Sequence, residues 1–336
     1  LSGCGNLNYL AQSASGHLSL MTQRQPIEDV ISDPGTTPQL RKKLQLLMRQ
    51  REFAYSHLAL PDNGSYRSFV ALGRRYVTWI VVVTPTFSMQ PVPSCFLIVG
   101  CVAYRGFFSE MDARTYAAGF AADKYDTYVG GAGAYSTLGW FADPVLSTMT
   151  ARSEPGMAAV LFHELAHQRI YIADDTVFNE SYAVAVEQVG VRRWFEHQKR
   201  LEDVERYARA TNQRRQFTDL VAAAKARLND VYAQSDSNED KLAAKQGVFA
   251  WLRRQHEMLR VSWGGRSAYS RWVEGPLNNA KLVLVGTYAE YVQAFLALNE
   301  KSLDMESFHQ AAERIAQLPV GERRRQLREL RQRSDE

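Results

Sequence analysis

The sequence predicts an α+β protein that is predominantly helical, with a small N-terminal β region and a long helical C-terminal part. Residues 76–84 and 94–104 are rich in Val, Ile and aromatic residues, which favour strands. Helices are expected where apolar residues recur every third or fourth position, over 40–58, 110–122, 179–197, 201–233, 240–259 and 278–298. With 336 residues, 46% of them hydrophobic, the chain can bury a sizeable core.

One motif organises the helical part. Residues 163–167 read His-Glu-Leu-Ala-His. On a helix, residues four apart lie on one face, so His163 and His167 can bind the same metal ion. Glu164 can then take a proton from a metal-bound water. The apolar run 158–162 before the motif predicts a buried helix, in which a metal would satisfy the polar groups.

A third ligand is expected at Glu180. Catalytic zinc sites usually have three protein ligands and a water. Twelve residues separate His167 from Glu180, enough for a helix to end and a second to pack across it, with Asn179 as its cap. Glu187 lies two turns further on the same face. It is either a group that orients a ligand histidine or a solvated charge.

His-Glu-x-x-His followed by Asn-Glu-x-x-Ala resembles the gluzincins, zinc peptidases with two histidines and one glutamate. A closer resemblance, to a bacterial family of predicted zinc aminopeptidase lipoproteins, is carried by segments 104–108, 134–140, 179–181 and 278–280. It implies a zincin-like metallopeptidase with one Zn²⁺ and a peptide substrate. The resemblance to gluzincins implies that Tyr288, or else Tyr291, stabilises the oxyanion; the alternative for either tyrosine is a role in packing. The sequence lacks the Gly-x-Met-Glu-Asn segment of zinc aminopeptidases.

The glycine-rich stretch before the motif is expected to be extended, over 125–140. In zinc peptidases the strand before the motif helix commonly forms the edge on which the substrate lies, here Gly133, Ala134 and Tyr135. Such an edge offers unpaired backbone groups to a peptide. The alternative is a loop that only connects two elements.

The first residues, Leu1-Ser2-Gly3-Cys4, resemble a bacterial lipobox. That resemblance implies lipidation of Cys4 and a lipid-anchored protein on the periplasmic side of the cell envelope, with the outer membrane favoured. The alternative is a fragment that begins with a buried cysteine. In an oxidising compartment, Cys95 and Cys101 either form a disulfide or remain free thiols. A net charge of +4 is too small to imply nucleic acid as a partner.

Together these features divide the chain into a lipobox and tether (1–20), an α/β region with the substrate-edge strand (21–150), a helical zinc-binding region (151–320) and a basic tail (321–336), forming one catalytic unit. The expected function is that of a zinc aminopeptidase. The alternatives are a zinc endopeptidase of the envelope and a non-catalytic lipoprotein with a relict metal site. The oligomeric state stays open.

Overall fold

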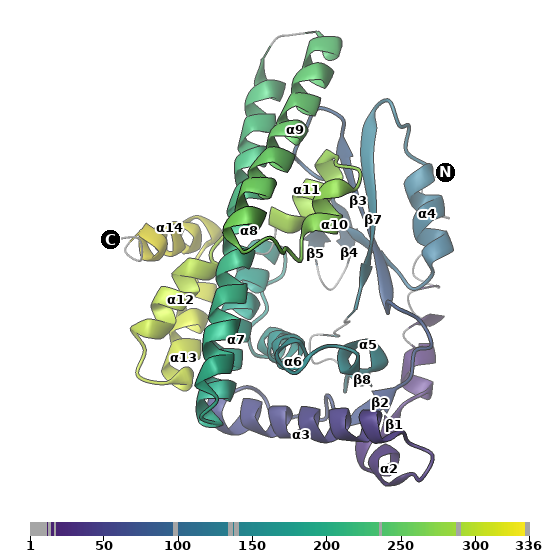
Figure 1. Cartoon of the computed structure of the whole chain (residues 1–336), viewed down its shortest axis with the longest axis vertical. Coiled ribbons are helices and arrows are strands. Elements are labelled where there is room, and N and C mark those ends of the chain that lie inside the picture. The colour runs from purple at the N-terminus through teal and green to yellow at the C-terminus, as the bar shows by residue number, and fades with distance from the viewer. Residues whose placement is uncertain are drawn as a thin grey trace.

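The computed structural model describes residues 12, 15–16, 18–96, 100–133, 137, 141–234, 237–286 and 290–332. Helices dominate this part of the chain (Figure 1), which confirms the prediction of a predominantly helical α+β protein. Its helices are α2 (Ile27–Ser32), α3 (Pro38–Leu58), α4 (Glu110–Ala118), α5 (Ser147–Thr150), α6 (Glu154–Arg169), α7 (Thr176–His197), α8 (Leu201–Ala233), α9 (Asn238–Ser262), α10 (Ser270–Glu274), α11 (Asn279–Gly286), α12 (Val292–Glu300), α13 (Met305–Ala316) and α14 (Val320–Gln332). None of the described helices combines the length and the apolar character needed to span a bilayer.

The strands in the described part of the chain form three small sheets. They are β1 (Gln25–Pro26), β2 (Ser68–Val70), β3 (Thr78–Pro85), β4 (Ser94–Phe96), β5 (Gly100–Val102), β6 (Arg105–Phe107), β7 (Tyr125–Ala132) and β8 (Val145–Leu146). Their orders are β1-β2-β8, β6-β3-β7 and β4-β5. The longest pairing is the antiparallel one of β3 with β7, from Thr78 opposite Ala132 to Pro85 opposite Tyr125. The sequence therefore located the β region, but the 94–104 run holds two short antiparallel strands, β4 and β5, and ends just before β6.

Close packing accounts for two glycines. In β7, the ring of Tyr76 occupies the space that a side chain at Gly131 would need. In α7, a Cβ at Gly190 would lie 2.7 Å from the ring of Phe162 in α6 and 2.8 Å from Leu58 in α3. Gly190 thus lets α6 and α7 approach each other, next to His163. Because both neighbours are fully buried, they have little room to move.

The C-terminal helices pack onto α7 and α3. His309 of α13 is fully buried, and its Nε2 donates to the carbonyl oxygen of Leu58 at 2.8 Å. Its Nδ1 then accepts from the hydroxyl of Tyr182 at 2.7 Å. Residues 321–336 were expected to form a basic tail, yet α14 buries Arg323 and Leu327 against the helical body. Tertiary packing therefore buries one arginine, Arg323, of this strongly charged segment.

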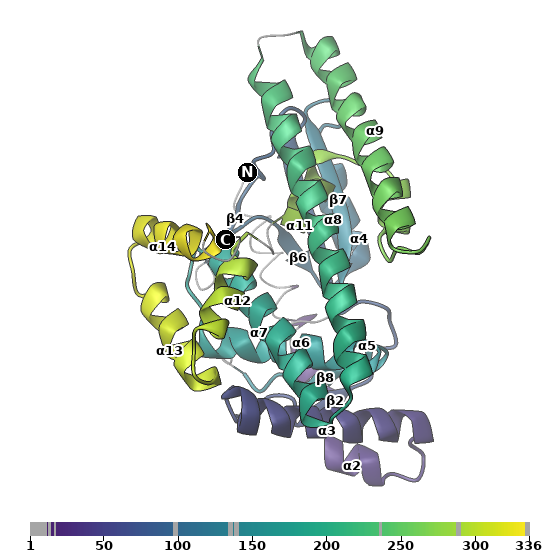
Figure 2. The same ribbon diagram turned by 60° about the vertical axis from the view of Figure 1, so that its left-hand side comes forward.

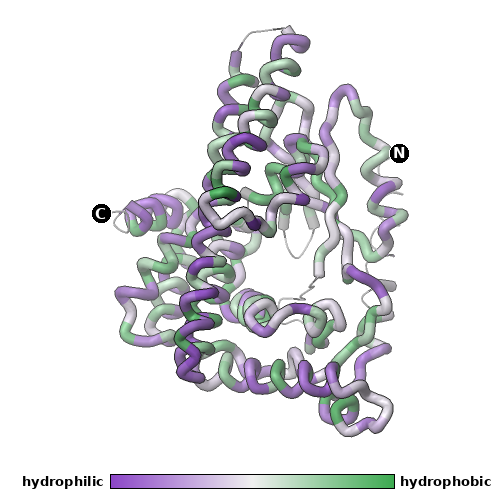
Figure 3. The backbone as a smooth tube through the Cα atoms, viewed as in Figure 1, coloured by the Kyte–Doolittle hydropathy of each residue, from purple (hydrophilic) through white to green (hydrophobic). Residues whose placement is uncertain are grey.

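Helices α8 and α9 form an antiparallel hairpin whose closed end projects beyond the rest of the molecule (Figures 1 and 2), while α10 and α11 pack against it. Hydrophilic and hydrophobic stretches alternate along both (Figure 3), as amphipathic helices require. The bounds of α8 agree with the predicted 201–233. The single helix expected over 278–298 is wrong, because α11 packs on β3 and β7 whereas α12 packs on α7. The two packing partners lie in different directions, so one straight helix cannot serve both.

Candidate metal centre

The motif lies in the last turns of α6, and Glu180 lies in the second turn of α7. Helix α6 is capped by Ser153, whose hydroxyl accepts from the Gly156 N–H. Helix α7 begins at Thr176 and is capped by Asp175, which accepts from the Phe178 N–H at 3.2 Å. The expectation that Asn179 is the cap is therefore wrong.

Asn179 instead fastens the connection between the two helices. Its amide donates to the carbonyl oxygen of Ile172 at 2.7 Å and accepts from the Ile172 N–H at 2.8 Å. The true cap, Asp175, forms a buried ion pair with Arg323 of α14 at 2.9 Å. Both ends of the connection are thus held, which fixes where Glu180 points.

The structure brings His163, His167 and Glu180 together. The two Nε2 atoms are 3.2 Å apart. Glu180 places Oε2 3.3 Å from Nε2 of His163 and Oε1 3.6 Å from Nε2 of His167. Ligands held at about 2.0–2.1 Å by a tetrahedral zinc ion are separated by about 3.3–3.4 Å. The observed spacing and the two-histidine, one-carboxylate donor set therefore fit zinc.

Burial supports the same fit. The side chains of His163, His167 and Glu180 are 17%, 7% and 13% exposed. Apart from its 3.3 Å contact with His163, the buried Oε2 of Glu180 has no partner within the described residues. A buried carboxylate whose two oxygens each face an imidazole nitrogen is an arrangement that a cation would satisfy.

Glu187 connects this cluster to a residue that the sequence analysis did not identify. Its Oε2 lies 3.5 Å from Nδ1 of His163. Its Oε1 accepts a 2.7 Å hydrogen bond from Nη1 of Arg214, in α8. The carboxylate is buried, with a 10% exposed side chain. Of the two interpretations left open for Glu187, the solvated charge is wrong, because the carboxylate is buried between His163 and Arg214. Nothing in the sequence marked Arg214, because only tertiary packing brings α8 back to α7.

The carboxylates of the site have divergent pKa values. Burial raises the pKa of Glu164. Burial acts in the same direction on Glu180, but the contacts with His163 and His167 outweigh it and lower the pKa to about 2. For Glu187, burial is outweighed first by the charge of Arg214 and then by His163, and the pKa also falls to about 2. Glu164 is thus the one carboxylate whose environment favours proton uptake.

His163 shows how strongly the site attracts positive charge. Burial alone would lower its pKa, but the contacts with Glu180 and Glu187 outweigh burial and raise the pKa to about 10. Two carboxylates that hold a proton on an imidazole this firmly create a negative potential in which a divalent cation is also stabilised.

Tyr171, in the connection between α6 and α7, lies beside the cluster. The ring of Tyr171 is 6.5 Å from the ring of His167, measured between centroids. Burial raises the pKa of Tyr171, and the charge of Glu180 adds to this effect. Tyr291 packs in the main core, and its backbone N–H donates to Ser181 at 3.1 Å. Tyr288 lies outside the described residues.

The remaining candidate residues lie in different places. Cys95 and Cys101 form a disulfide across the β4–β5 hairpin. The Cys101 N–H donates to Asp174, in the connection between α6 and α7, at 2.7 Å. The carbonyl oxygen of Gly133 accepts a hydrogen bond from the hydroxyl of Thr148, in α5, at 2.6 Å. Cys4, Ala134 and Tyr135 lie outside the described residues.

The fold and the site define a predominantly helical protein whose two central helices join two histidines and a glutamate in a cluster suited to a metal ion. The chain belongs to the family described as "Putative aminopeptidase", whose model matches residues 8–327. Membership in this family points to a peptidase. Searches of curated proteins and of solved structures gave no significant match.

Proposed function

We propose that the protein is a zinc-dependent aminopeptidase of gluzincin type with a zincin-like arrangement of its two central helices. The observation that carries the proposal is the spacing of His163, His167 and Glu180, which corresponds to one face of a zinc tetrahedron, beside a glutamate whose pKa is raised. The family match supports peptide substrates.

The chain's own residues have distinct tasks in peptide hydrolysis. The two histidines and Glu180 hold the ion, and Glu187 orients His163 through Nδ1. Zinc supplies Lewis acidity, which acidifies water and polarises the substrate carbonyl. Glu164 accepts the proton of the attacking water and passes it to the leaving amine. Its raised pKa suits both halves of that transfer.

The developing oxyanion needs a hydrogen-bond donor from the protein. Tyr288 is the donor expected from the sequence, and Tyr171 is a second candidate because its ring lies beside His167. A hydroxyl whose pKa is raised remains protonated at neutral pH and can donate.

Lipid attachment at Cys4 and a place on the periplasmic side of the envelope are part of the proposal. They rest on the Leu1–Cys4 sequence. The Cys95–Cys101 disulfide accords with an oxidising compartment.

Metal-free protein, prepared with a chelator and then titrated with zinc, tests the function. We expect hydrolysis of a peptide with a free amino terminus to appear in proportion to zinc, up to one ion per chain. The same peptide with an acetylated amino terminus should not be cleaved. Equal cleavage of both peptides would identify an endopeptidase, and no cleavage of either by the zinc-loaded protein would refute peptidase activity.

A further inference from the structure

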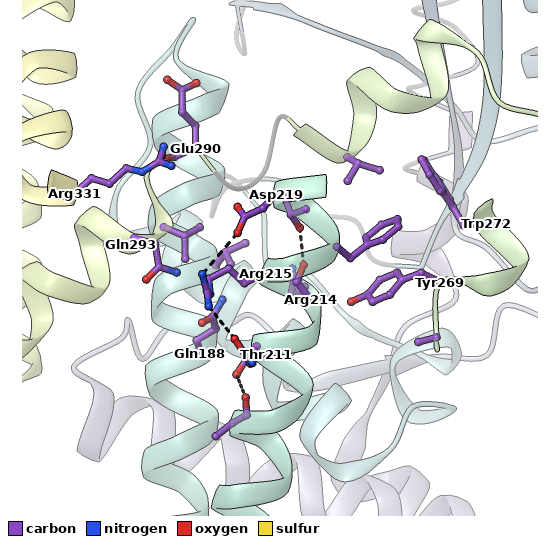
Figure 4. A pocket seen from close by; sticks show the side chains of 18 residues that line it. Gln188, Thr211, Arg214, Arg215, Asp219, Tyr269, Trp272, Glu290, Gln293 and Arg331 are labelled. Carbon is purple, nitrogen blue, oxygen red and sulfur yellow. Dashed lines mark hydrogen bonds and ion pairs between the residues drawn. The ribbon is translucent and has the colours of Figure 1, made fainter. Parts of the chain in front are cut away.

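A cavity of about 610 Å³ opens between α7, α8 and the segments around α10 and α12 (Figure 4). Its volume falls within the roughly 300–1,000 Å³ typical of ligand sites. The residues that would hold the metal do not line it. The cavity is therefore a separate space. It is linked to the metal centre by residues that line the cavity and also neighbour or contact residues of the centre.

Two residues establish that relation. Val184 lines the cavity and follows Glu180 by one turn of α7, which is about 6 Å along the helix axis. Arg214 also lines it, and the same guanidinium donates to Glu187, which contacts His163. One or two residues of an extended peptide, at about 3.3–3.6 Å each, bridge this distance.

One wall of the cavity is aromatic. Phe217 and Tyr269 are stacked with centroids 4.0 Å apart and an interplanar angle of 7°. Trp272 meets Phe217 edge-on at 5.3 Å. In Figure 4, Tyr269 and Trp272 lie together on the side opposite Gln188 and Gln293. Flat apolar rings arranged in this way favour an aromatic or large aliphatic side chain.

The charges around the cavity are mostly paired within the protein. Arg215 donates to Asn212 at 2.9 Å and lies 3.7 Å from Asp219. Arg214 differs, since Nη1 binds Glu187 while its other N–H groups have no partner in the described part of the chain. Its side chain is 42% exposed. These groups can donate to a carbonyl oxygen without breaking the contact with Glu187.

We propose that this cavity binds an apolar, preferably aromatic, side chain of the peptide substrate close to the bond that is cleaved, and that Arg214 donates to a neighbouring peptide carbonyl. The position relative to the cleaved bond rests on the proposed function. Binding of the side chain itself does not, because it needs only the aromatic wall of the cavity.

Two variants fill the cavity. Ala268→Trp adds a ring to the wall from an exposed loop position. Thr211→Phe adds one from α8, where the hydroxyl bonds only to carbonyl groups of its own helix. Ala222→Trp is the matched control, since Ala222 is exposed on α8 and does not line the cavity. Circular dichroism selects the filled variants that keep the native fold.

The first readout is calorimetric binding of short peptides with free amino termini to zinc-loaded Glu164→Gln protein. The peptides differ only by Phe, Leu, Ala or Asp at each position in turn. At one position we expect Phe to bind at least about ten-fold more tightly than Ala. A folded cavity-filling variant should lose this preference, and Ala222→Trp should keep it. The second readout is kcat/KM for the same peptides with zinc-loaded protein that retains Glu164.

The outcomes separate this proposal from the proposed function. Selective binding without hydrolysis would support the cavity and refute the peptidase. Hydrolysis with equal kcat/KM for Phe and Ala peptides at every position would refute the cavity and leave the peptidase standing. A folded cavity-filling variant that retains the full preference for Phe would also overturn the proposal.

Discussion

Removing the charge of Glu187 is the change that best probes how the metal centre is supported. Glu187→Gln keeps the shape of the side chain and an oxygen that can accept from Nδ1 of His163. It loses the negative charge that now bridges His163 and Arg214. We therefore expect weaker zinc binding by a protein that remains folded.

The distances set the size of the effect. Loss of a group that orients a metal-binding histidine typically costs about 10–100-fold in metal affinity. The contact of Glu187 with His163 is 3.5 Å, longer than the roughly 2.7–2.9 Å of a strong charged hydrogen bond. The glutamine also keeps one acceptor. Both points favour the lower end, so we expect a loss of about ten-fold, or about 1.4 kcal/mol.

A competition titration with a chromophoric chelator measures the affinity. Glu196→Gln is the control, because Glu196 lies on the same helix, is exposed and pairs only at 3.9 Å with Arg192. The control should bind zinc as the unaltered protein does. If folded Glu187→Gln protein also bound zinc with unchanged affinity, the role assigned to this carboxylate would be wrong.

Three further predictions concern the surroundings of the site. Arg323→Gln should lower the free energy of unfolding by about 3–5 kcal/mol in urea titrations, because it leaves Asp175 buried without its partner. The exposed Arg325→Gln is its control and should have little effect. Burial lowers the pKa of His309 to about 4 in the folded protein, whereas an exposed histidine in the unfolded chain has a pKa of about 6.5. Between these two pH values the unfolded chain therefore binds a proton that the folded protein does not. Stability should therefore be fully present above pH 6.5 and fall as the pH drops toward 4, by up to about 3 kcal/mol. Tyr171→Phe should lower kcat by about 100-fold if its hydroxyl stabilises the oxyanion.

Each of these has a clear contrary result. Equal destabilisation by the Arg323 and Arg325 variants would show that the buried ion pair contributes no more to the free energy of unfolding than an exposed one. A free energy of unfolding with the same pH dependence in His309→Gln protein would remove His309 as the titrating group. Normal kcat in Tyr171→Phe combined with a large loss in Tyr288→Phe would assign the oxyanion to Tyr288.

Much of the metal centre could be predicted because its spacing is local. Helical geometry places His163 and His167 on one face whatever surrounds them. Glu180 followed because a short connection forces two helices to pack side by side. The bounds of α8 were also predictable, since a long amphipathic pattern needs no outside partner to be recognised.

The remainder depends on contacts between distant segments. The start of α7 was misplaced because Asn179, a good cap by type, is used to hold Ile172 instead. Burial of Arg323 follows from a partner far earlier in the chain, Asp175. Arg214 approaches the centre only because α8 turns back along α7. Neither composition nor periodicity carries such information.

The central claim is that Glu164 moves the proton in a zinc-dependent hydrolysis. Its most direct test is the hydrolysis rate of a peptide with a free amino terminus by zinc-loaded Glu164→Gln protein, with zinc content measured on the same sample. We expect one zinc per chain and a rate lower by at least about 100-fold. A variant that holds zinc and cleaves the peptide at the unaltered rate would contradict the account.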